Sequence, residues 1–283
     1  MTYCIGIKTN EGLVFASDSR TNAGLDNVNI YSKMFTHDVG DRTIVMVTSG
    51  NLGTSQAVYK SVEKDLKSSS GILNLNTCKD FEQIASYVGG LNIKHSSPQG
   101  INTDDVLLGS TFIIGGQIKG QKPELYLIYP QGNYIRPADS KPYLVIGEVK
   151  YGKPILDRVI KPDVSIGDAS RCALISMDST LKSDLTVGPP IDFAIYKKDE
   201  NKLASLKCLS LDDEDYSKVC NTWSEGIFKV FDTFPRFDSL DSISDTPTNY
   251  GTDTGAGGEV RGNYCVLNSL ARKEAFNEIS PYF

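Results

Sequence analysis

The chain has 283 residues, of which 40% are hydrophobic, enough for one large core or two smaller domains. Its net charge of −6 argues against non-specific binding to nucleic acid. No apolar run approaches the roughly 20 residues that a membrane-spanning helix needs, which argues against a membrane partner.

The cysteines and histidines restrict the chemistry further. Six cysteines are scattered without paired spacing, and the chain runs from Met1 almost directly into an apolar strand pattern. We therefore expect no secretory leader, a cytoplasmic location and reduced thiols rather than disulfides. The two histidines, His37 and His95, are too few for a His-rich metal site, and we expect neither a metal nor a cofactor.

The first half of the chain predicts two β-hairpins followed by two helices. Strands are expected at 3–9 and 12–18, around a tight turn at Asn10-Glu11, and at 34–36 and 44–47, around Gly40-Asp41. Apolar residues at three- and four-residue steps predict helices over 52–68 and 80–93, before a polar surface loop at 94–107.

The second half alternates strands and helices. The Gly-rich run after the strand at 111–114 reads as a hairpin turn, which is favoured over a phosphate cradle because no helix starts after it. The order of elements predicts an α+β fold of antiparallel sheets with helices packed outside. Strands are expected at 111–114, 124–129, 143–146, 191–196 and 203–209, and helices at 151–160, 167–183 and 212–232.

The composition changes after Pro235. Residues 236–262 are rich in Ser, Asp, Thr and Gly and cannot bury much surface. We therefore predict one globular domain over 1–235 and a mostly flexible tail over 236–283, with a short helix at 271–276.

The second residue of the chain carries a potential nucleophile. Small residues after an initiator Met permit its removal, which would leave Thr2 with a hydroxyl and a free α-amine. The reference pKa of such an amine is about 7.7–8.0, so the amine can act as a base for the hydroxyl. The alternative is that Thr2 has no special role.

Two charged residues lie where they could tune Thr2. A two-residue loop at Asn10-Glu11 pairs Thr2 with Ser19, and a loop one residue longer pairs it with Asp18, so Asp18 is close to Thr2 in either register. Lys33 enters the next strand and, if buried, would favour the ionised hydroxyl. The alternatives are that Asp18 caps a turn beside Arg20, and that Lys33 extends into solvent.

These segments resemble the proteasome β-subunit family of N-terminal nucleophile hydrolases, and most closely its bacterial branch called the ancestral beta subunit, or Anbu. The resemblance covers about residues 1–235 and implies a four-layer α-β-β-α sandwich of two antiparallel sheets. The segments that carry it are Met1–Gly6, Gly12–Gly24, Lys33, Tyr151–Arg158 and Val187–Asp192.

The resemblance also implies the roles of particular residues. Thr2 matches the nucleophile, Asp18 the orienting carboxylate and Lys33 the lysine that tunes the threonine. Ser49 and Gly50 stand where the family has a Gly-Gly pair that forms the oxyanion hole, and which of their two amides points inward is open. Asp184 matches the family's late aspartate.

Two positions depart from the family. Glu148 stands where proteasome β-subunits carry a serine of a Gly-Ser-Gly-Ser run, and Val187 replaces the serine that follows the late aspartate. These departures put the proton-relay network in doubt, but not the nucleophile.

The resemblance implies a self-assembling threonine peptidase that forms a ring or an open spiral of many subunits. Some relatives need a ring ATPase, and no docking motif for one is found in the sequence. The alternatives are an assembly or binding particle with a vestigial site, and an amidase acting on a non-protein amide.

Overall fold

The computed structural model describes residues 1–22, 28–68, 71–96 and 108–235. The chain divides into two compact units, Met1–Cys220 and Asn221–Phe283, which are described separately. The predicted tail over 236–283 and its short helix lie outside the described residues, as does most of the predicted loop at 94–107.

One five-stranded antiparallel sheet contains the N-terminus. Its order is β10-β1-β2-β11-β12. Strands β1 and β2 pair from Thr9–Gly12 to Cys4–Ser17, which is the register of a symmetric two-residue loop. That register places Thr2 at the level of Ser19. The strands are β1 (Tyr3–Thr9), β2 (Gly12–Asp18), β10 (Tyr143–Gly147), β11 (Ile191–Lys197) and β12 (Leu203–Leu209).

The second five-stranded sheet is also antiparallel and follows chain order, β5-β6-β7-β8-β9. A separate two-stranded ribbon, β3 (Arg20–Asn22) with β4 (Val28–Ile30), connects the two sheets along the chain. The strands of the second sheet are β5 (Met34–Val39), β6 (Arg42–Gly50), β7 (Ser110–Ile118), β8 (Glu124–Ile128) and β9 (Tyr134–Ile135).

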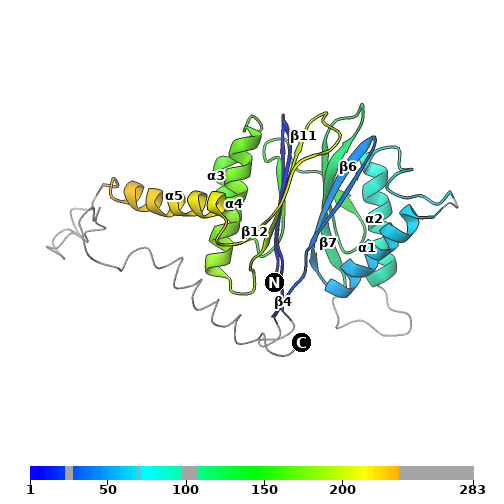
Figure 1. Cartoon of the computed structure of the whole chain (residues 1–283), viewed down its shortest axis with the longest axis horizontal. Helices are drawn as coiled ribbons and strands as arrows, with labels where there is room; N and C mark the ends of the chain where they lie inside the picture. The colour runs from blue at the N-terminus through cyan, green and yellow to red at the C-terminus, as the bar shows by residue number, and fades with distance from the viewer. Residues whose placement is uncertain (23–27, 69–70, 97–107, 236–283) are drawn as a thin grey trace. The chain divides into compact units, whose positions relative to one another are not determined.

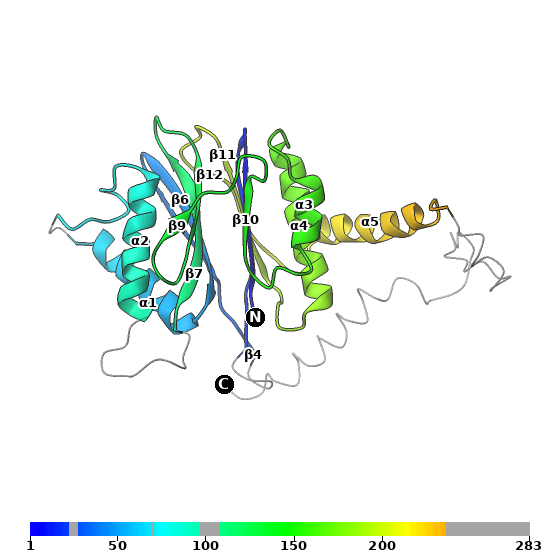
Figure 2. The same ribbon diagram turned by 180° about the vertical axis from the view of Figure 1, so that it is seen from behind.

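Helices cover the outer faces of both sheets in Met1–Cys220. Figures 1 and 2 show α1 and α2 against the β5–β9 sheet, and α3 and α4 against the sheet of β1. Asn51 and Ser165 cap α1 and α4 by accepting hydrogen bonds from backbone N–H groups. The helices are α1 (Leu52–Leu66), α2 (Phe81–Ser96), α3 (Lys153–Val159), α4 (Ile166–Ser183) and α5 (Glu214–Phe231). The predicted four-layer α-β-β-α sandwich is confirmed.

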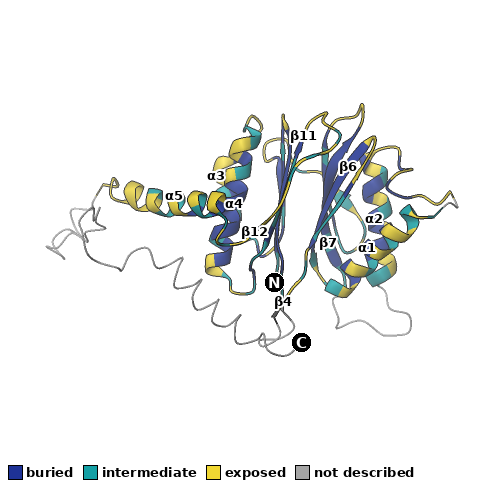
Figure 3. Ribbon diagram, in the orientation of Figure 1, coloured by how far each residue is buried: buried dark blue, intermediate teal, exposed yellow. Residues whose placement is uncertain are grey.

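Three apolar clusters fill the spaces between these layers. One lies between the sheet of β1 and helices α3 and α4, and reaches Tyr216 and Cys220 of α5. A second lies between the β5–β9 sheet and α1 and α2. The third lies between the two sheets, so the central strands β1, β2, β6 and β7 are buried along most of their length (Figure 3). Within the described residues, no helix is long and apolar enough to cross a membrane.

Two glycines bring the sheets close together. A Cβ added at Gly6 of β1 would lie 2.8 Å from Ile113 Cγ2, and one added at Gly115 of β7 would lie 2.9 Å from Phe15 Cζ. Both added atoms would also approach Leu125 Cδ1, at 3.0 and 2.9 Å. The Phe15 ring therefore lies close to Gly115, at a contact between the sheets where a larger residue would collide.

Several elements differ from those expected. The Gly-rich run 115–120 does lead into a hairpin turn, but the turn comes later than expected, because β7 continues through Gly115 and Gly116 to Ile118 and pairs with β6 and β8. The short pairings β3–β4 and β8–β9 were not anticipated. Strand β6 is longer than the strand expected at 44–47 and also includes Ser49 and Gly50.

Candidate active site at the N-terminus

A buried ion pair lies next to the start of the chain. Lys33 Nζ is 2.7 Å from Asp18 Oδ1, and the two residues are 3% and 0% exposed. Lys33 Nζ also donates to the carbonyl of Arg20 at 2.7 Å. Lys33 therefore does not extend into solvent, and the ion pair joins the end of β2 to the start of β5.

Backbone amides surround the other side of the Asp18 carboxylate. Tyr3 N donates to Oδ1 at 3.0 Å, while Arg20 N and Gly188 N donate to Oδ2 at 3.2 and 3.3 Å. Burial raises the pKa of Asp18, and Lys33 with these backbone donors opposes that rise. The carboxylate thus links the residue after Thr2, the first residue of β3 and the segment before β11.

The backbone of Thr2 is held by the chain that follows β10. Glu148 N donates to the Thr2 carbonyl at 2.7 Å. Gly147 precedes it with a φ of +88°, and a Cβ there would overlap the Thr2 carbonyl. Thr2 itself is half-buried, and Met1 is 61% exposed. The nucleophile candidate therefore lies at a fixed backbone position that solvent reaches.

Tyr3 anchors the same segment from the helix side. Its ring is fully buried, and its hydroxyl lies 2.8 Å from Ser176 Oγ of α4. Gly152, at the start of α3, leaves room for this pair, because a Cβ there would overlap Tyr3 Oη and lie 2.6 Å from Ser176 Oγ.

The geometry of β6 separates the two candidate oxyanion amides. Thr48 N donates to the Lys33 carbonyl at 3.1 Å, and Asn51 N donates to the Gly109 carbonyl at 3.4 Å. N–H groups alternate in direction along an antiparallel strand. The Gly50 amide therefore points to the same side of β6 as the Thr48 amide, which is the side of β5. Because β5 begins only at Met34, the Gly50 amide lies past the end of that strand. The Ser49 amide points the other way, toward its pairing partner on β7.

Gly50 has a backbone conformation that suits this position. Its φ is +105°, and a Cβ there would lie 2.8 Å from the Gly109 carbonyl. The glycine allows β6 to turn sharply into α1, which begins two residues later.

Asp184 lies at the C-terminal end of α4. Its Oδ1 accepts hydrogen bonds from Thr186 N at 2.8 Å and Thr186 Oγ1 at 2.6 Å. Val187 is fully buried in the core against the helices. A hydroxyl thus does bond to Asp184, but it comes from Thr186, one residue before the position where the family has its serine.

Charges of both signs act on the N-terminal amine, which belongs to Met1 in this chain. Burial lowers its pKa, and Lys33 lowers it further, whereas Asp18, Asp184 and Glu148 raise it. The structure therefore brings these charged residues around one end of the chain. A lowered pKa leaves an amine neutral, and so able to accept a proton, at a lower pH.

Sequence reasoning missed three supports of this site. The Arg20 carbonyl, the Gly188 amide and the Tyr3–Ser176 contact all take part in it. Gly188 is 170 residues from Asp18, and backbone donors leave no mark in a residue pattern. Nothing in the sequence pairs Tyr3 with Ser176, since each alone reads as a core residue.

Comparisons with known proteins agree with this architecture. The sequence profile of the family described as "Proteasome subunit" matches residues 2–196. The chain is 24% identical over 206 residues to a proteasome subunit beta of Haloquadratum walsbyi, covering 70% of this chain and 74% of that protein.

Solved structures of Anbu proteins are more similar. The chain is 40% identical to the Anbu Gly-1 mutant of Hyphomicrobium sp. strain MC1, with a TM-score of 0.76 over 84% of this chain and 100% of that one. It is 36% identical to a Pseudomonas aeruginosa chain described as a helical assembly of the Anbu complex, with a TM-score of 0.78 over 88% and 100%. The chain therefore belongs to the proteasome subunit family, in its Anbu branch.

Proposed function

We propose that this chain is an N-terminal threonine hydrolase that cleaves peptide bonds after Met1 has been removed. The observation that carries the proposal is the buried Asp18–Lys33 pair beside residue 2. A buried lysine ammonium is costly unless something compensates it, and here the carboxylate that compensates it also accepts a hydrogen bond from the amide of Tyr3, the residue after Thr2. The residues proposed for catalysis are Thr2, Asp18, Lys33, Ser49, Gly50 and Asp184.

In the proposed reaction, Thr2 Oγ attacks the peptide carbonyl and its proton passes to the Thr2 α-amine, directly or through water. The carbonyl oxygen becomes an oxyanion that accepts a hydrogen bond from the Gly50 amide, with Ser49 shaping the strand around it. The amine then protonates the leaving amine, and water hydrolyses the acyl-enzyme. While Met1 is attached, residue 2 has an amide nitrogen, which cannot act as this base.

We also propose that the chain acts as a cytoplasmic homo-oligomer. The helical assembly described for the Pseudomonas aeruginosa relative supports self-association of similar chains. The substrate class rests on the family, whose proteasome members are peptidases. A ring ATPase partner has no support in the described residues.

A binding or assembly particle with a vestigial site is the second candidate function. It is favoured by Val187, whose buried aliphatic side chain replaces a hydroxyl of the relay network. An amidase acting on a non-protein amide would use the same nucleophile, and a panel of amide substrates would separate it from a peptidase.

The proposed function is tested by intact mass measurement and by labelling with an epoxyketone or a β-lactone. We expect a mass without Met1 and one adduct on Thr2. Thr2→Ala should abolish labelling, and Lys33→Ala should slow it by about 10²- to 10⁴-fold, the range for loss of a proton-transfer group. Retained Met1 together with no adduct would refute the proposal.

Two controls separate chemistry from folding. Lys60→Ala removes an exposed lysine of α1 and should leave the labelling rate unchanged. Thermal unfolding of each variant shows whether the fold persists, because Lys33→Ala leaves the Asp18 carboxylate buried without its partner. Equal labelling of Lys33→Ala and Lys60→Ala would contradict the role of Lys33.

A further inference from the structure

Glu148 is a buried carboxylate with weak compensation. The residue is 6% exposed, and the hydrogen bond found for its side chain within the described residues is a long one, from Lys150 N to Oε1 at 3.3 Å. Its ion-pair partner, Lys150 Nζ, is 3.8 Å away on a side chain that is 75% exposed. Since buried charge is costly without close partners, this carboxylate has capacity for another cation.

The backbone places Glu148 directly beside the start of the chain. Glu148 N donates to the Thr2 carbonyl at 2.7 Å, and Gly147 approaches that carbonyl so closely that no side chain fits there. The hydrogen bond from Glu148 is made to the residue that carries the N-terminal amine after Met1 is removed, and to the residue next to the amine-bearing one before that removal. The amine is therefore close to the backbone of Glu148 in both forms.

The other charged groups that face the amine are more fully engaged. Asp18, at the end of β2, contacts Lys33 and three backbone amides. Asp184, after α4, accepts two hydrogen bonds from Thr186. Lys33, before β5, is held by Asp18 and the Arg20 carbonyl. Glu148 is thus the least engaged of the three carboxylates that act on the amine, although Asp18 and Asp184 act on it more strongly in this structure.

We propose that Glu148 is a positioning residue that pairs with the charged N-terminal amine and so fixes the pH above which that amine can accept the Thr2 proton. The carboxylate accepts no proton itself, because the proton moves from Thr2 Oγ to the amine nitrogen. The serine at this position in proteasome β-subunits is uncharged, so this chain would tune its base differently. The catalytic consequence rests on the proposed function, whereas the pairing does not.

The direction of the effect follows from the charges. A carboxylate stabilises the ammonium and opposes the lowering caused by burial and by Lys33. Removing the charge of Glu148 should therefore lower the pKa of the amine. The amine would then become neutral at lower pH, and the acid limb of the rate profile would move to lower pH.

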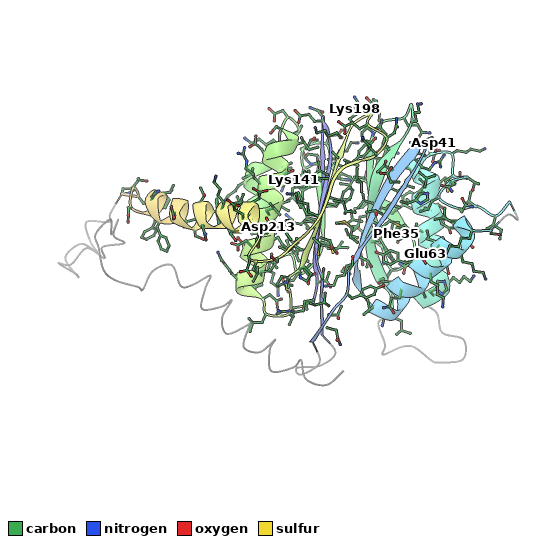
Figure 4. All side chains as sticks on the ribbon, viewed as in Figure 1. Phe35, Asp41, Glu63, Lys141, Lys198 and Asp213 are labelled. Carbon is green, nitrogen blue, oxygen red and sulfur yellow. The ribbon has the colours of Figure 1, made fainter. Side chains whose placement is uncertain are left out.

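The pairing is tested by competitive labelling of the N-terminal amine with acetic anhydride across pH, read by peptide mass spectrometry on the full chain. Glu148→Gln keeps an oxygen for Lys150 N and removes the charge. We expect its amine to titrate about 0.5 to 1 pH unit below that of the unmodified protein. Glu63→Gln, on α1 (Figure 4), removes an exposed carboxylate and should cause no shift.

A second variant keeps the test informative if Glu148→Gln does not fold. Glu148→Asp withdraws the carboxylate by one carbon and should shift the titration in the same direction by less. Without pairing, removing or moving the carboxylate should leave the amine unchanged. An amine that titrates within about 0.1 pH unit of the unmodified protein in both variants would therefore overturn the proposal. An equal shift in Glu63→Gln would do the same.

This measurement separates failure of the inference from failure of the proposed function. The amine is labelled whether or not the chain hydrolyses a substrate, and whether it belongs to Met1 or Thr2. A shifted amine with no β-lactone adduct would support the pairing and refute the hydrolase. An active enzyme with an unshifted amine and an unshifted acid limb of kcat/KM would do the reverse.

Discussion

Tyr3 shows how a single residue can fix the position of its neighbour, here the proposed nucleophile Thr2. Its amide donates to Asp18, and its buried hydroxyl contacts Ser176, so both ends of the residue are held by different elements. The space for the hydroxyl depends on Gly152 having no side chain. The placement of Thr2 is thus partly determined by a packing contact on its far side.

Adding a methyl group at Gly152 should disturb this contact. We expect Gly152→Ala to lower the free energy of unfolding by about 1–3 kcal/mol, the usual cost of overpacking. Tyr3→Phe should cost about 1 kcal/mol through its lost hydrogen bond. The double variant should lose less than the sum, because the phenylalanine removes the hydroxyl that the methyl group would approach most closely. Urea unfolding measures all three.

Gly90→Ala is the matched control for that cycle. A Cβ at Gly90 of α2 meets nothing within 4 Å, so the change should be neutral or stabilise the helix by up to about 1 kcal/mol. Strict additivity of Tyr3→Phe and Gly152→Ala would show that the two residues do not share this space.

At the scale of residues, the sequence predicted which side chains lie close to Thr2 better than which backbone groups hydrogen-bond to them. Asp18 and Lys33 were expected close to Thr2, and the structure places them in contact with each other, with Asp18 also accepting a hydrogen bond from the Tyr3 amide. The Gly188 amide could not be foreseen, because any residue supplies an N–H and only the fold determines where it points. The roles of these residues in catalysis stay predictions.

At the scale of elements, β7 explains the main error of the sequence interpretation. Gly115 and Gly116 suggest a turn, yet they lie in a strand paired on both sides. A Cβ at Gly116 would overlap the Thr43 carbonyl, so the glycine permits a close approach of two strands. Local composition cannot distinguish this from a turn, whereas the hairpin of β1 and β2 was predictable from alternation and its short loop.

The link between β10 and α3 should respond to pH. The Asp157 carboxylate accepts hydrogen bonds from Lys141, Lys153 and Tyr143 at 2.6–2.8 Å, and these partners lower its pKa (Lys141 is labelled in Figure 4). We expect Asp157→Asn to reduce the free energy of unfolding by about 1 kcal/mol at pH 7, since the site is partly screened by solvent.

The sign of the pH effect follows from the lowered pKa. The stabilisation is complete above the ordinary aspartate pKa of about 4 in the unfolded chain, and it declines as the pH falls toward the lower folded value. The difference between the two proteins should therefore be smaller at pH 3 than at pH 7, as measured by urea unfolding. A difference that grows on acidification would contradict the assignment.

At the scale of the whole molecule, the three apolar clusters described here all lie between Tyr3 and Cys220. The order of elements predicted antiparallel sheets with helices packed outside, because strands and amphipathic helices have distinct periods, whereas the four-layer arrangement was implied by the family resemblance. The boundary proposed at residue 235 rests on composition alone and stays a prediction.

A chain ending at residue 235 tests that boundary. We expect it to fold with an unchanged far-UV circular dichroism shape, and with a midpoint of thermal unfolding within about 2 °C of the full chain, because such a shift corresponds to under 1 kcal/mol for a domain of this size. A loss of cooperative unfolding would mean that residues 236–283 contribute to the core.

The contact of Phe15 with Gly115 has a consequence for the alignment of the groups proposed for catalysis. Asp18 belongs to one sheet, while Lys33 and Gly50 are attached to the other, so a slide of one sheet over the other would separate them. The Phe15 ring packs beside Gly115, and the Ile113 side chain packs against Gly6. These interlocking contacts oppose such a slide, because the side chains would collide with their neighbours. The alignment of the proposed site thus depends on packing in the apolar layer between the two sheets.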